Sequence, residues 1–280
     1  MTLISVVIPS YNAAKWLPET IDSVLKQTHK ETEIIIVDDH STDNTKEVVD
    51  RYIQKFGESK IRYSRNEKNL GECITSRRGF DAAKGEYICR LSADDMYFDI
   101  LKLENQYEYM EITQADWSYD ASYLKGTSIT GSKIIDTYWL PPIIPIPFPK
   151  WRLFLQRFDN WVLSHPWLAF LLILKNCPIN SSTLMFSRES YLSHTKWSDE
   201  HRSNCDGHLL YNLLLEGTKG VAMHNSLGAL YRTHPDQMSY SVVYIIDIHR
   251  VREKIFKKVE EGAYPLWFKV ATKIASWSIL

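Results

Sequence analysis

Short apolar strands alternate with amphipathic helices along the first 112 residues, and this alternation restricts the chain to a small set of folds. Runs of β-branched residues at 3–8 and 33–37 predict buried strands, and the segments 60–64 and 86–91 predict two more. Apolar residues at helical spacing predict helices between them, over 15–28, after the capping residues 41–43 and over about 71–84. This order is typical of a parallel sheet with helices on its faces.

The second half of the chain has a less regular pattern. It predicts helices near 98–112 and at 206–216, and strands around 116–120, 183–186 and 220–224. The composition shifts near residue 115, but no linker rich in Gly or Ser marks a boundary there. We therefore expect one body with three parts, which are residues 1–115, residues 116–240 and a helical, basic-amphipathic tail at 241–280.

Overall charge and cysteine usage narrow the functional classes. The 280 residues include 33 Lys and Arg against 34 Asp and Glu, a formal net charge of −1, so no basic excess favours nucleic-acid binding. The four cysteines lie far apart and form no CxxC pair, which disfavours a zinc site or a disulfide framework and favours a reducing compartment. The first residues lack the pattern of a signal peptide, so the sequence predicts a cytoplasmic protein.

Polar side chains follow three of the four predicted strands at the points where the strands end. Tyr11 lies just after the first strand, Asp38 and Asp39 follow the second, and Asp94 and Asp95 follow the fourth. Ligands of open parallel sheets bind beyond the carboxyl ends of the strands. Two carboxylate pairs at one edge are costly without a counter-charge, so they favour a metal and nucleotide site. The alternative is that each pair caps the helix that follows it.

These segments also carry a family resemblance. The run from SVVIPSYN at 5–12 to VDDHSTDNT at 37–45, followed by NLGECITSRRGFDAAKGEYICRLSADD at 69–95, closely resembles family 2 glycosyltransferases of the GT-A fold. The resemblance covers about residues 3–112 and resumes more weakly at 176–240. It implies a Rossmann-like, mostly parallel central sheet flanked by helices, with an acceptor-binding second half.

The resemblance also implies an activity. Such enzymes transfer a sugar from a nucleotide diphosphate donor, here favouring a UDP-sugar, to an acceptor hydroxyl with inversion. Residues 1–115 would bind the nucleotide sugar, and residues 116–240 would bind the acceptor and supply the catalytic base. The implied setting is surface polysaccharide or glycolipid assembly, with a glycan or a lipid-linked glycan as acceptor. Two alternatives are a sugar nucleotidyltransferase, although PSYNAAKW at 9–16 is not the Gly-rich loop that it needs, and a non-catalytic nucleotide-sugar binder.

The resemblance assigns donor-binding roles to residues of the first half. Pro9 and Tyr11 would line the base pocket, with Tyr11 packed on the nucleobase, and Asp39 would accept a hydrogen bond from the base. Arg77 or Arg78 would add a cationic contact to the donor, at the place where the family often carries Arg-Asn. The alternative for one of these arginines is a solvated helix face.

A divalent cation is the implied cofactor. Asp94 would hold the ribose, and Asp95 would bind a Mn²⁺ or Mg²⁺ ion that bridges the two phosphates, since these hard cations prefer oxygen ligands. Ser92 stands where many members carry the first Asp of this motif. His234, in the run YRTH at 231–234, would complete the metal shell or contact the diphosphate. The alternative is a hydrogen-bonded structural histidine.

The implied catalytic base is Asp206, which opens an apolar helical segment. Cys205 replaces the Glu that usually precedes this Asp, and we do not expect Cys205 to act as a nucleophile. The alternative interpretation is that Asp206 is only the N-cap of the helix. Asp199 and Glu200 are the fallback candidates for the base.

The distribution of aromatic and cationic residues also predicts where in the cell the protein acts. Four tryptophans lie between 139 and 167, and the tail from 250 to 280 carries seven Lys and Arg against three Glu, interleaved with apolar residues. This composition suits the headgroup region of an anionic membrane, so we expect peripheral association with the inner face of the cell membrane. The apolar run 161–174 is too short to span a bilayer and predicts a buried or interfacial helix. The alternative is that the tryptophans fill the core and that the tail packs on the body or on a second subunit, as in a homodimer.

Overall fold

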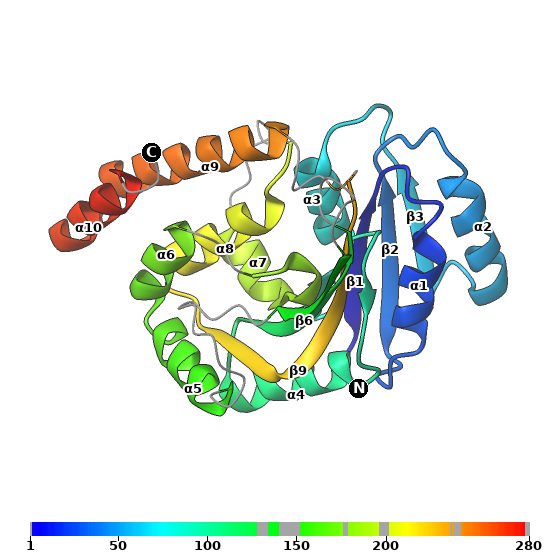
Figure 1. Cartoon of the computed structure of the whole chain (residues 1–280), viewed down its shortest axis with the longest axis horizontal. Coiled ribbons are helices and arrows are strands. Elements are labelled where there is room, and N and C mark those ends of the chain that lie inside the picture. Colours follow the sequence, from blue (N-terminus) through cyan, green and yellow to red (C-terminus); the bar gives the residue numbers. More distant parts are fainter. Residues whose placement is uncertain are drawn as a thin grey trace.

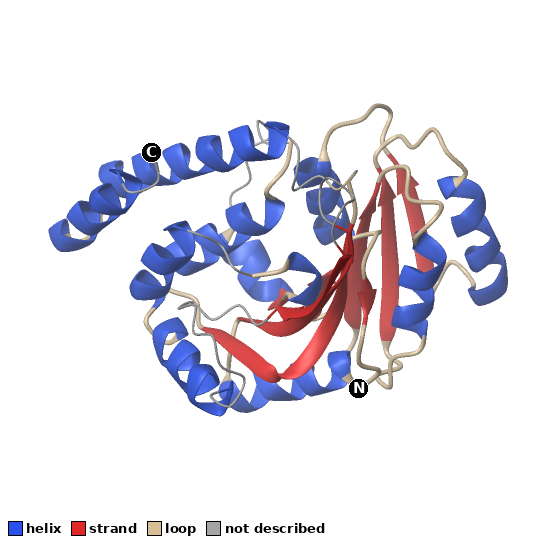
Figure 2. Cartoon of the chain, in the orientation of Figure 1, coloured by secondary structure: helices blue, strands red, loops and turns tan. Residues whose placement is uncertain are grey.

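The computed structural model describes residues 2–127, 134–139, 152–175, 179–195, 202–235, 237 and 242–277. Within these ranges the chain folds into a mixed α/β structure whose curled central sheet carries helices on both faces (Figure 1; Figure 2). Asp199 and Glu200, the fallback candidates for the base, lie outside the described residues.

The N-terminal part of the sheet is parallel. β1 pairs in parallel with both β2 and β4, and β2 pairs in parallel with β3. This arrangement confirms the parallel sheet that the alternation of strands and helices predicts. The four strands are β1 (Ile4–Ser10), β2 (Thr32–Asp38), β3 (Ile61–Arg65) and β4 (Tyr87–Arg90).

The unbroken apolar run of β1 is explained by burial on both faces of the sheet. Ile4, Val6 and Ile8 belong to the core under the first two helices, whereas Val7 faces the third helix. A Cβ atom on Gly79 of this third helix would lie only 2.2 Å from Cγ1 of Val7, so glycine permits the close approach of helix and strand. The helices are α1 (Leu17–Leu25), α2 (Thr45–Phe56) and α3 (Glu72–Ala82).

The second half extends the same sheet and adds further helices. Its first elements are β5 (Met96–Tyr97), α4 (Lys102–Thr113), β6 (Trp117–Thr127), β7 (Ile134–Trp139), α5 (Arg152–Leu163) and α6 (Pro166–Lys175). A short 3-10 turn (Ser181–Thr183) leads into β8 (Met185–Ser187), α7 (Arg188–His194), α8 (Cys205–Leu215), β9 (Gly220–Thr233), α9 (Val242–Glu261) and α10 (Leu266–Trp277).

The complete strand order places the two halves in one sheet. Within the described ranges the order is β3-β2-β1-β4-β8-β6-β9-β5, with β7 paired to β6. The short strand β8 is antiparallel to both β4 and β6 and therefore joins the parallel half to the long strands β6 and β9. Both long strands extend well beyond the expected ranges 116–120 and 220–224, because polar residues such as Ser122 and Lys125 interrupt the apolar pattern but still pair with neighbours.

The apolar run 161–174 forms the end of α5 and most of α6, and Pro166 occupies the first position of α6, where proline is well tolerated. Phe170 is fully buried and packs against Tyr211 of α8 and Phe268 of α10. The run is therefore divided between two helices instead of forming the single helix expected, and α6 packs into the core through residues such as Phe170. Among the described residues, every helix is too short or too polar to cross a bilayer.

Candidate functional site

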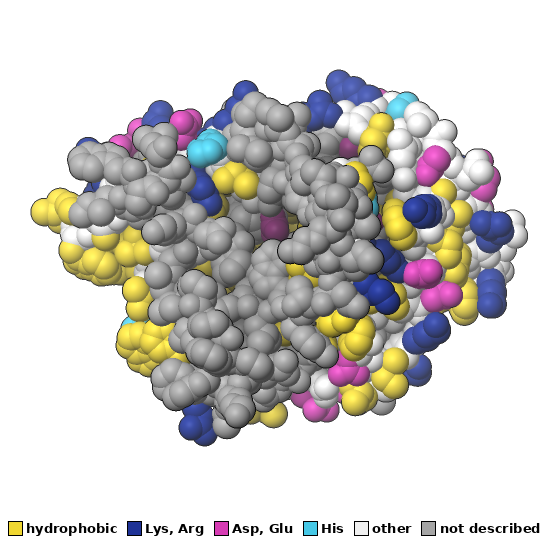
Figure 3. Space-filling model, in the orientation of Figure 1, with side chains coloured by type: hydrophobic (Ala, Val, Ile, Leu, Met, Phe, Trp, Pro, Cys, Tyr) yellow, Lys and Arg dark blue, Asp and Glu magenta, His cyan; other side chains and the backbone are white. Residues whose placement is uncertain are grey.

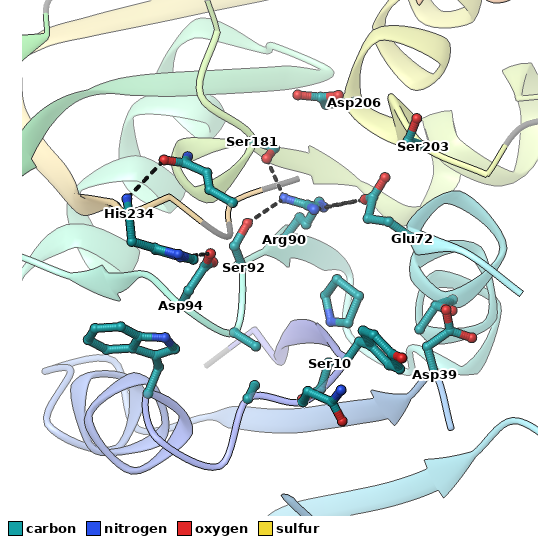
Figure 4. A pocket seen from close by; sticks show the side chains of 18 of the residues that line it. Ser10, Asp39, Glu72, Arg90, Ser92, Asp94, Ser181, Ser203, Asp206 and His234 are labelled. Atoms are coloured by element: carbon teal, nitrogen blue, oxygen red, sulfur yellow. Dashed lines mark hydrogen bonds and ion pairs between the residues drawn. The ribbon is translucent and has the colours of Figure 1, made fainter. Parts of the chain in front are cut away.

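A cavity of about 1300 Å³ opens at the carboxyl ends of β1, β2 and β4. Its remaining walls come from the start of α3, the turn before β8, the loop that leads into α8, and the end of β9 (Figure 4). Residues from both halves of the chain therefore face one space. Of the residues expected at the site, the cavity is lined by Pro9, Tyr11, Asp39, Asp94, Asp206 and His234.

Tyr11 and Pro9 lie at one edge of the cavity. Tyr11 is 51% exposed, so its ring is open to a flat ligand. A second aromatic residue, Trp16, also lines the cavity, and its ring stacks on His234 with 5.7 Å between ring centroids. The helical spacing of Trp16 indicates a core residue, so the sequence pattern gives no sign of this position at the cavity.

The carboxylate of Asp39 organises the loop that precedes α3. It accepts hydrogen bonds from the backbone N–H groups of Leu70 and Gly71, at 2.7 and 2.8 Å, and from the side chain of Asn66 at 2.8 Å. Asp39 is almost fully buried yet contributes to the cavity wall. Its contacts in the protein are therefore those of a loop anchor beside the space expected for the nucleobase.

The two adjacent carboxylates Asp94 and Asp95 point in different directions. Oδ2 of Asp94 lies 3.1 Å from Nε2 of His234, and both residues line the cavity (Figure 4). Asp95 is 1% exposed and does not line the cavity, and its oxygens accept hydrogen bonds from the Ser182 hydroxyl and, at 2.9 Å, from the backbone N–H of Arg232. The carboxylate expected to bind the metal is thus turned into the protein, and the one expected at the ribose faces the cavity beside His234.

Burial and the neighbouring charge of Asp94 raise the pKa of Asp95 to about 8. A carboxyl group of this kind is suited to joining β4 to β9 through hydrogen bonds. Among the described residues, no group of three or more His, Cys, Asp and Glu side chains gathers as a complete metal site. The Asp94–His234 pair offers one oxygen and one nitrogen donor, which fits a Mg²⁺-like ion that takes most of its ligands from substrate phosphates and water.

The arginines expected at the donor do not line the cavity. Arg77 pairs with Asp81 on its own helix, with 3.5 Å between Nε and Oδ2, and Arg78 donates to the side chain of Asn66. The cavity instead receives Arg90, at the end of β4, and Arg202, from the loop before α8. Arg90 lies in the run EYICRL, whose pattern predicts an ordinary buried strand. The sequence therefore gives no sign that Arg90 lines the cavity.

Arg90 is 6% exposed and holds several groups together. Its Nη2 lies 2.8 Å from Oε1 of Glu72, and its Nη1 donates to the hydroxyl groups of Ser92, at 3.0 Å, and Ser181 (Figure 4). Glu72 is the first residue of α3. A buried ion pair therefore lies at the wall of the cavity between β4 and α3.

Asp206 lies in the first turn of α8 and is half-buried at the cavity wall. The N-cap position belongs to Asn204, so the alternative interpretation of Asp206 as the helix N-cap is not supported. Oδ1 of Asp206 accepts the backbone N–H of Gly207 at 2.9 Å. Burial raises the pKa of Asp206, Arg90 lowers it, and Glu72 raises it.

Cys205 is fully buried, and burial raises its pKa well above that of a free thiol. Thiols of this kind are unreactive, because the thiolate is the nucleophilic form. These surroundings favour the expectation that Cys205 is not a nucleophile.

The sheet order and the mixed α/β architecture, with a cavity at the carboxyl ends of the parallel strands, are those of the GT-A fold. The profile described as "Glycosyl transferase family 2" matches residues 5–176, and the chain belongs to this family. Solved structures agree with the fold. Staphylococcus aureus TarS 1–349 in complex with UDP-GlcNAc superposes with a TM-score of 0.71 at 18% identity, covering 99% of this chain and 71% of that one. The mannosyltransferase PcManGT from Pyrobaculum calidifontis, in complex with GDP-Man and Mn²⁺, has a TM-score of 0.65 at 16% identity, covering 99% and 72%.

The alignments with curated relatives each cover less than half of this chain. The putative teichuronic acid biosynthesis glycosyltransferase TuaG of Bacillus subtilis is 40% identical over 108 residues, or 39% of this chain and 42% of that protein. The UDP-Glc:alpha-D-GlcNAc-diphosphoundecaprenol beta-1,3-glucosyltransferase WfaP of Escherichia coli is 37% identical over 132 residues, or 47% of this chain and 51% of that protein. The chain thus spans about half the length of these two relatives.

Proposed function

We propose that this protein transfers a sugar from a UDP-sugar to an acceptor hydroxyl with inversion at the anomeric carbon. The observation that carries the proposal is that one cavity joins two kinds of group on different walls: the Asp94–His234 pair and the half-buried carboxylate of Asp206 (Figure 4). Membership of glycosyl transferase family 2 supports the reaction class. The UDP in the names of WfaP and of the TarS complex favours this nucleotide.

In the proposed donor site, Tyr11 and Pro9 flank the nucleobase and Asp39 holds the neighbouring loop. Asp94 and His234 would hold a Mn²⁺ or Mg²⁺ ion, in place of the Asp95 suggested by the sequence. Such an ion supplies positive charge that stabilises the departing diphosphate. Asp95 would support this arrangement from behind through its contacts with Ser182 and Arg232.

In the proposed transfer step, Asp206 accepts the proton of the acceptor hydroxyl. The acceptor oxygen forms a bond to the anomeric carbon from the face opposite the nucleotide, and the bond from this carbon to the phosphate oxygen breaks. UDP leaves with the bonding electron pair. Surroundings that raise the pKa of a carboxylate towards neutrality make it a better general base, and general bases contribute typically 10²–10⁴-fold.

The proposed acceptor is a cell-surface glycan or its lipid-linked precursor. This follows from the teichuronic acid named for TuaG and from the diphosphoundecaprenol-linked acceptor named for WfaP. In this division of labour, residues 1–115 bind the donor, and residues 116–240 bind the acceptor and supply Asp206.

A lipid-linked acceptor requires contact with a membrane, and the C-terminal helices offer a surface for it. On α10, Leu266, Trp267 and Val270 are at least half exposed, and the ring of Trp267 packs on Trp167 of α6. An apolar patch is visible at the end of the molecule where α10 and α6 lie (Figure 3). We propose that this patch, together with Lys269 beside it, lies on the headgroups of the cytoplasmic leaflet.

The proposal is tested by UDP release from UDP-glucose and UDP-GlcNAc, with Mn²⁺ or with EDTA, using water or a soluble glycan as acceptor. The wild-type protein should release UDP only with the metal present, and Asp206→Asn should lower the rate by about 10²–10⁴-fold while UDP still binds. UDP binding without turnover of any nucleotide sugar tested would instead indicate a non-catalytic binder.

A further inference from the structure

The buried ion pair between Arg90 and Glu72 has no part in the roles proposed above. We infer that this pair positions Asp206 and balances the charge around it, so that Arg90 and Glu72 act on the proposed base in opposite directions. The description of Asp206 as a base rests on the proposed function. The contacts and charges around Asp206, which carry the inference, do not depend on it.

Glu72 bridges two elements of the site through its two carboxylate oxygens. Oε1 receives the guanidinium of Arg90 at 2.8 Å, and Oε2 accepts the backbone N–H of Cys205 at 3.3 Å. Cys205 is the first residue of α8 and the direct neighbour of Asp206. The backbone of α8 that carries Asp206 is thus tied to β4 through one carboxylate.

A second contact holds the same junction. The backbone N–H of Cys73 donates to the carbonyl of Arg202 at 3.0 Å, and a Cβ on Gly71 would lie 2.5 Å from that carbonyl oxygen. The start of α3 therefore packs directly against the loop before α8. Because Arg90 also binds Ser92 and Ser181, its guanidinium is held on several sides and cannot turn away from Asp206 without breaking these contacts.

The charges around Asp206 come from several elements. Arg90 on β4 and Glu72 on α3 act on it with opposite signs, the cation lowering and the carboxylate raising the pKa of Asp206. In the described part of the chain, further ionisable side chains near this junction are Arg202 in the preceding loop, Cys73 on α3, Cys205 and His208 on α8 itself, and Asp247 on α9, which accepts hydrogen bonds from Ser203. Arg90 is the charged group that most strongly counteracts the effect of burial on the pKa of Asp206. Removal of the Arg90 charge should therefore change this pKa the most.

The test reads the titration of Asp206 without any substrate. The free energy of unfolding in urea is measured from pH 4 to pH 9 for the wild-type protein and for Asp206→Asn, and the difference is plotted against pH. Asp206 keeps its proton in the folded protein above the pH at which the unfolded chain releases it. The stability of the wild type relative to Asp206→Asn therefore falls as pH rises and becomes constant above the folded pKa.

The same difference is then measured in three backgrounds. In Arg90→Gln the constant region should begin at a higher pH than in the wild type, and in Glu72→Gln it should begin at a lower pH. Arg90→Lys, which keeps the charge, should lie closer to the wild type than Arg90→Gln does. Arg62→Gln breaks a comparable ion pair, with Glu33 at 2.7 Å, away from the cavity and should leave the curve where it is.

Opposite shifts for Arg90→Gln and Glu72→Gln support the inference. If neither variant moves the curve, or if both move it in the same direction, the pair is only structural and the inference is overturned. Should Arg90→Gln fail to fold, the shift to lower pH in Glu72→Gln decides, because that variant retains the Arg90 charge. UDP release plays no part in this readout, so a failure of the proposed function would show separately as a wild-type protein that turns over no donor.

Discussion

Nε2 of His234 lies 3.1 Å from Oδ2 of Asp94, although 140 residues separate them in the sequence. Asp94 follows β4 and His234 follows β9, two strands that are not neighbours in the sheet. The contact closes one wall of the cavity and places a carboxylate and an imidazole side by side where a nucleotide diphosphate is expected. The two halves of the chain thus meet at this cavity through side chains that follow strands of both halves.

Asp94 and Asp95 should respond differently to substitution, because only Asp94 faces the cavity. Asp94→Asn should weaken Mn²⁺-dependent binding of UDP by at least about tenfold, since even indirect partners of metal ligands are worth this much. Asp95→Asn should retain most of the affinity. Isothermal titration calorimetry with and without Mn²⁺ measures both, and a loss confined to Asp95→Asn would restore Asp95 as the metal ligand.

The pH dependence of stability should identify Asp95 as a buried acid. Its pKa of about 8 in the folded protein exceeds the ordinary value of an aspartic acid, so the folded state retains a proton that the unfolded chain has lost. The wild type should therefore lose stability relative to Asp95→Asn as pH rises from about 4 to 8. Urea unfolding at several pH values measures this difference, and parallel curves for the two proteins would show that Asp95 is ionised in the folded state.

Gly71 should tolerate no side chain. Its φ of +94° favours glycine, and a Cβ would lie 2.5 Å from the carbonyl oxygen of Arg202. Gly71→Ala should cost about 1–3 kcal/mol of stability from the backbone strain alone and should also lower donor turnover, because it separates α3 from the loop before α8.

Gly57→Ala is the matched control for this substitution. Gly57 has a similar φ of +85°, but its nearest neighbour, Oγ of Ser59, would lie 3.7 Å from a new Cβ. It should carry the backbone strain without the clash and without loss of turnover. Equal effects of the two substitutions on thermal unfolding and UDP release would remove the special role of the contact between Gly71 and Arg202.

The apolar patch on α10 should bind anionic membranes. Wild-type protein should sediment with vesicles that contain phosphatidylglycerol at low salt, whereas the double variant Leu266→Ser/Trp267→Ser should remain in the supernatant. Ile112→Ser is the control, because Ile112 is 80% exposed on α4, outside the patch. Equal recovery of the wild type and the double variant in the supernatant would exclude the membrane and favour a soluble acceptor or a second subunit.

The sequence predicts the frame of the fold well, because buried strands such as β1 and β2 have unbroken apolar runs that few other structures accommodate. The sequence is less informative about the direction in which a given side chain points. Asp94 and Asp95 are adjacent and chemically identical, and only the folded chain shows that one carboxylate faces the cavity and the other faces Ser182. The same limit applies to Arg77, which helical periodicity alone does not orient towards a donor.

Other parts of the site depend on contacts between distant segments. In the sequence, Arg90 is one residue of a predicted buried strand. Its contacts with Glu72 and Ser181 form only in the folded chain. Trp16 has the helical spacing of a core residue, yet it lies just before α1 and its ring stacks on His234, more than 200 residues away in the sequence. The family resemblance points to Asp206, and this residue does line the cavity, whereas Asn204 holds the N-cap position of α8; the role of Asp206 as base stays a prediction.

The stereochemistry of transfer tests the proposed reaction most directly. With water as the acceptor, the first product from an α-linked UDP-sugar is the free sugar. ¹H NMR of this sugar, recorded before its α- and β-anomers interconvert, gives the configuration at the anomeric carbon. The wild-type protein should form the β-anomer, and Asp206→Asn should form it at least about 100-fold more slowly. Formation of the α-anomer, or an Asp206→Asn protein as fast as the wild type, would contradict an inverting transfer with Asp206 as its base.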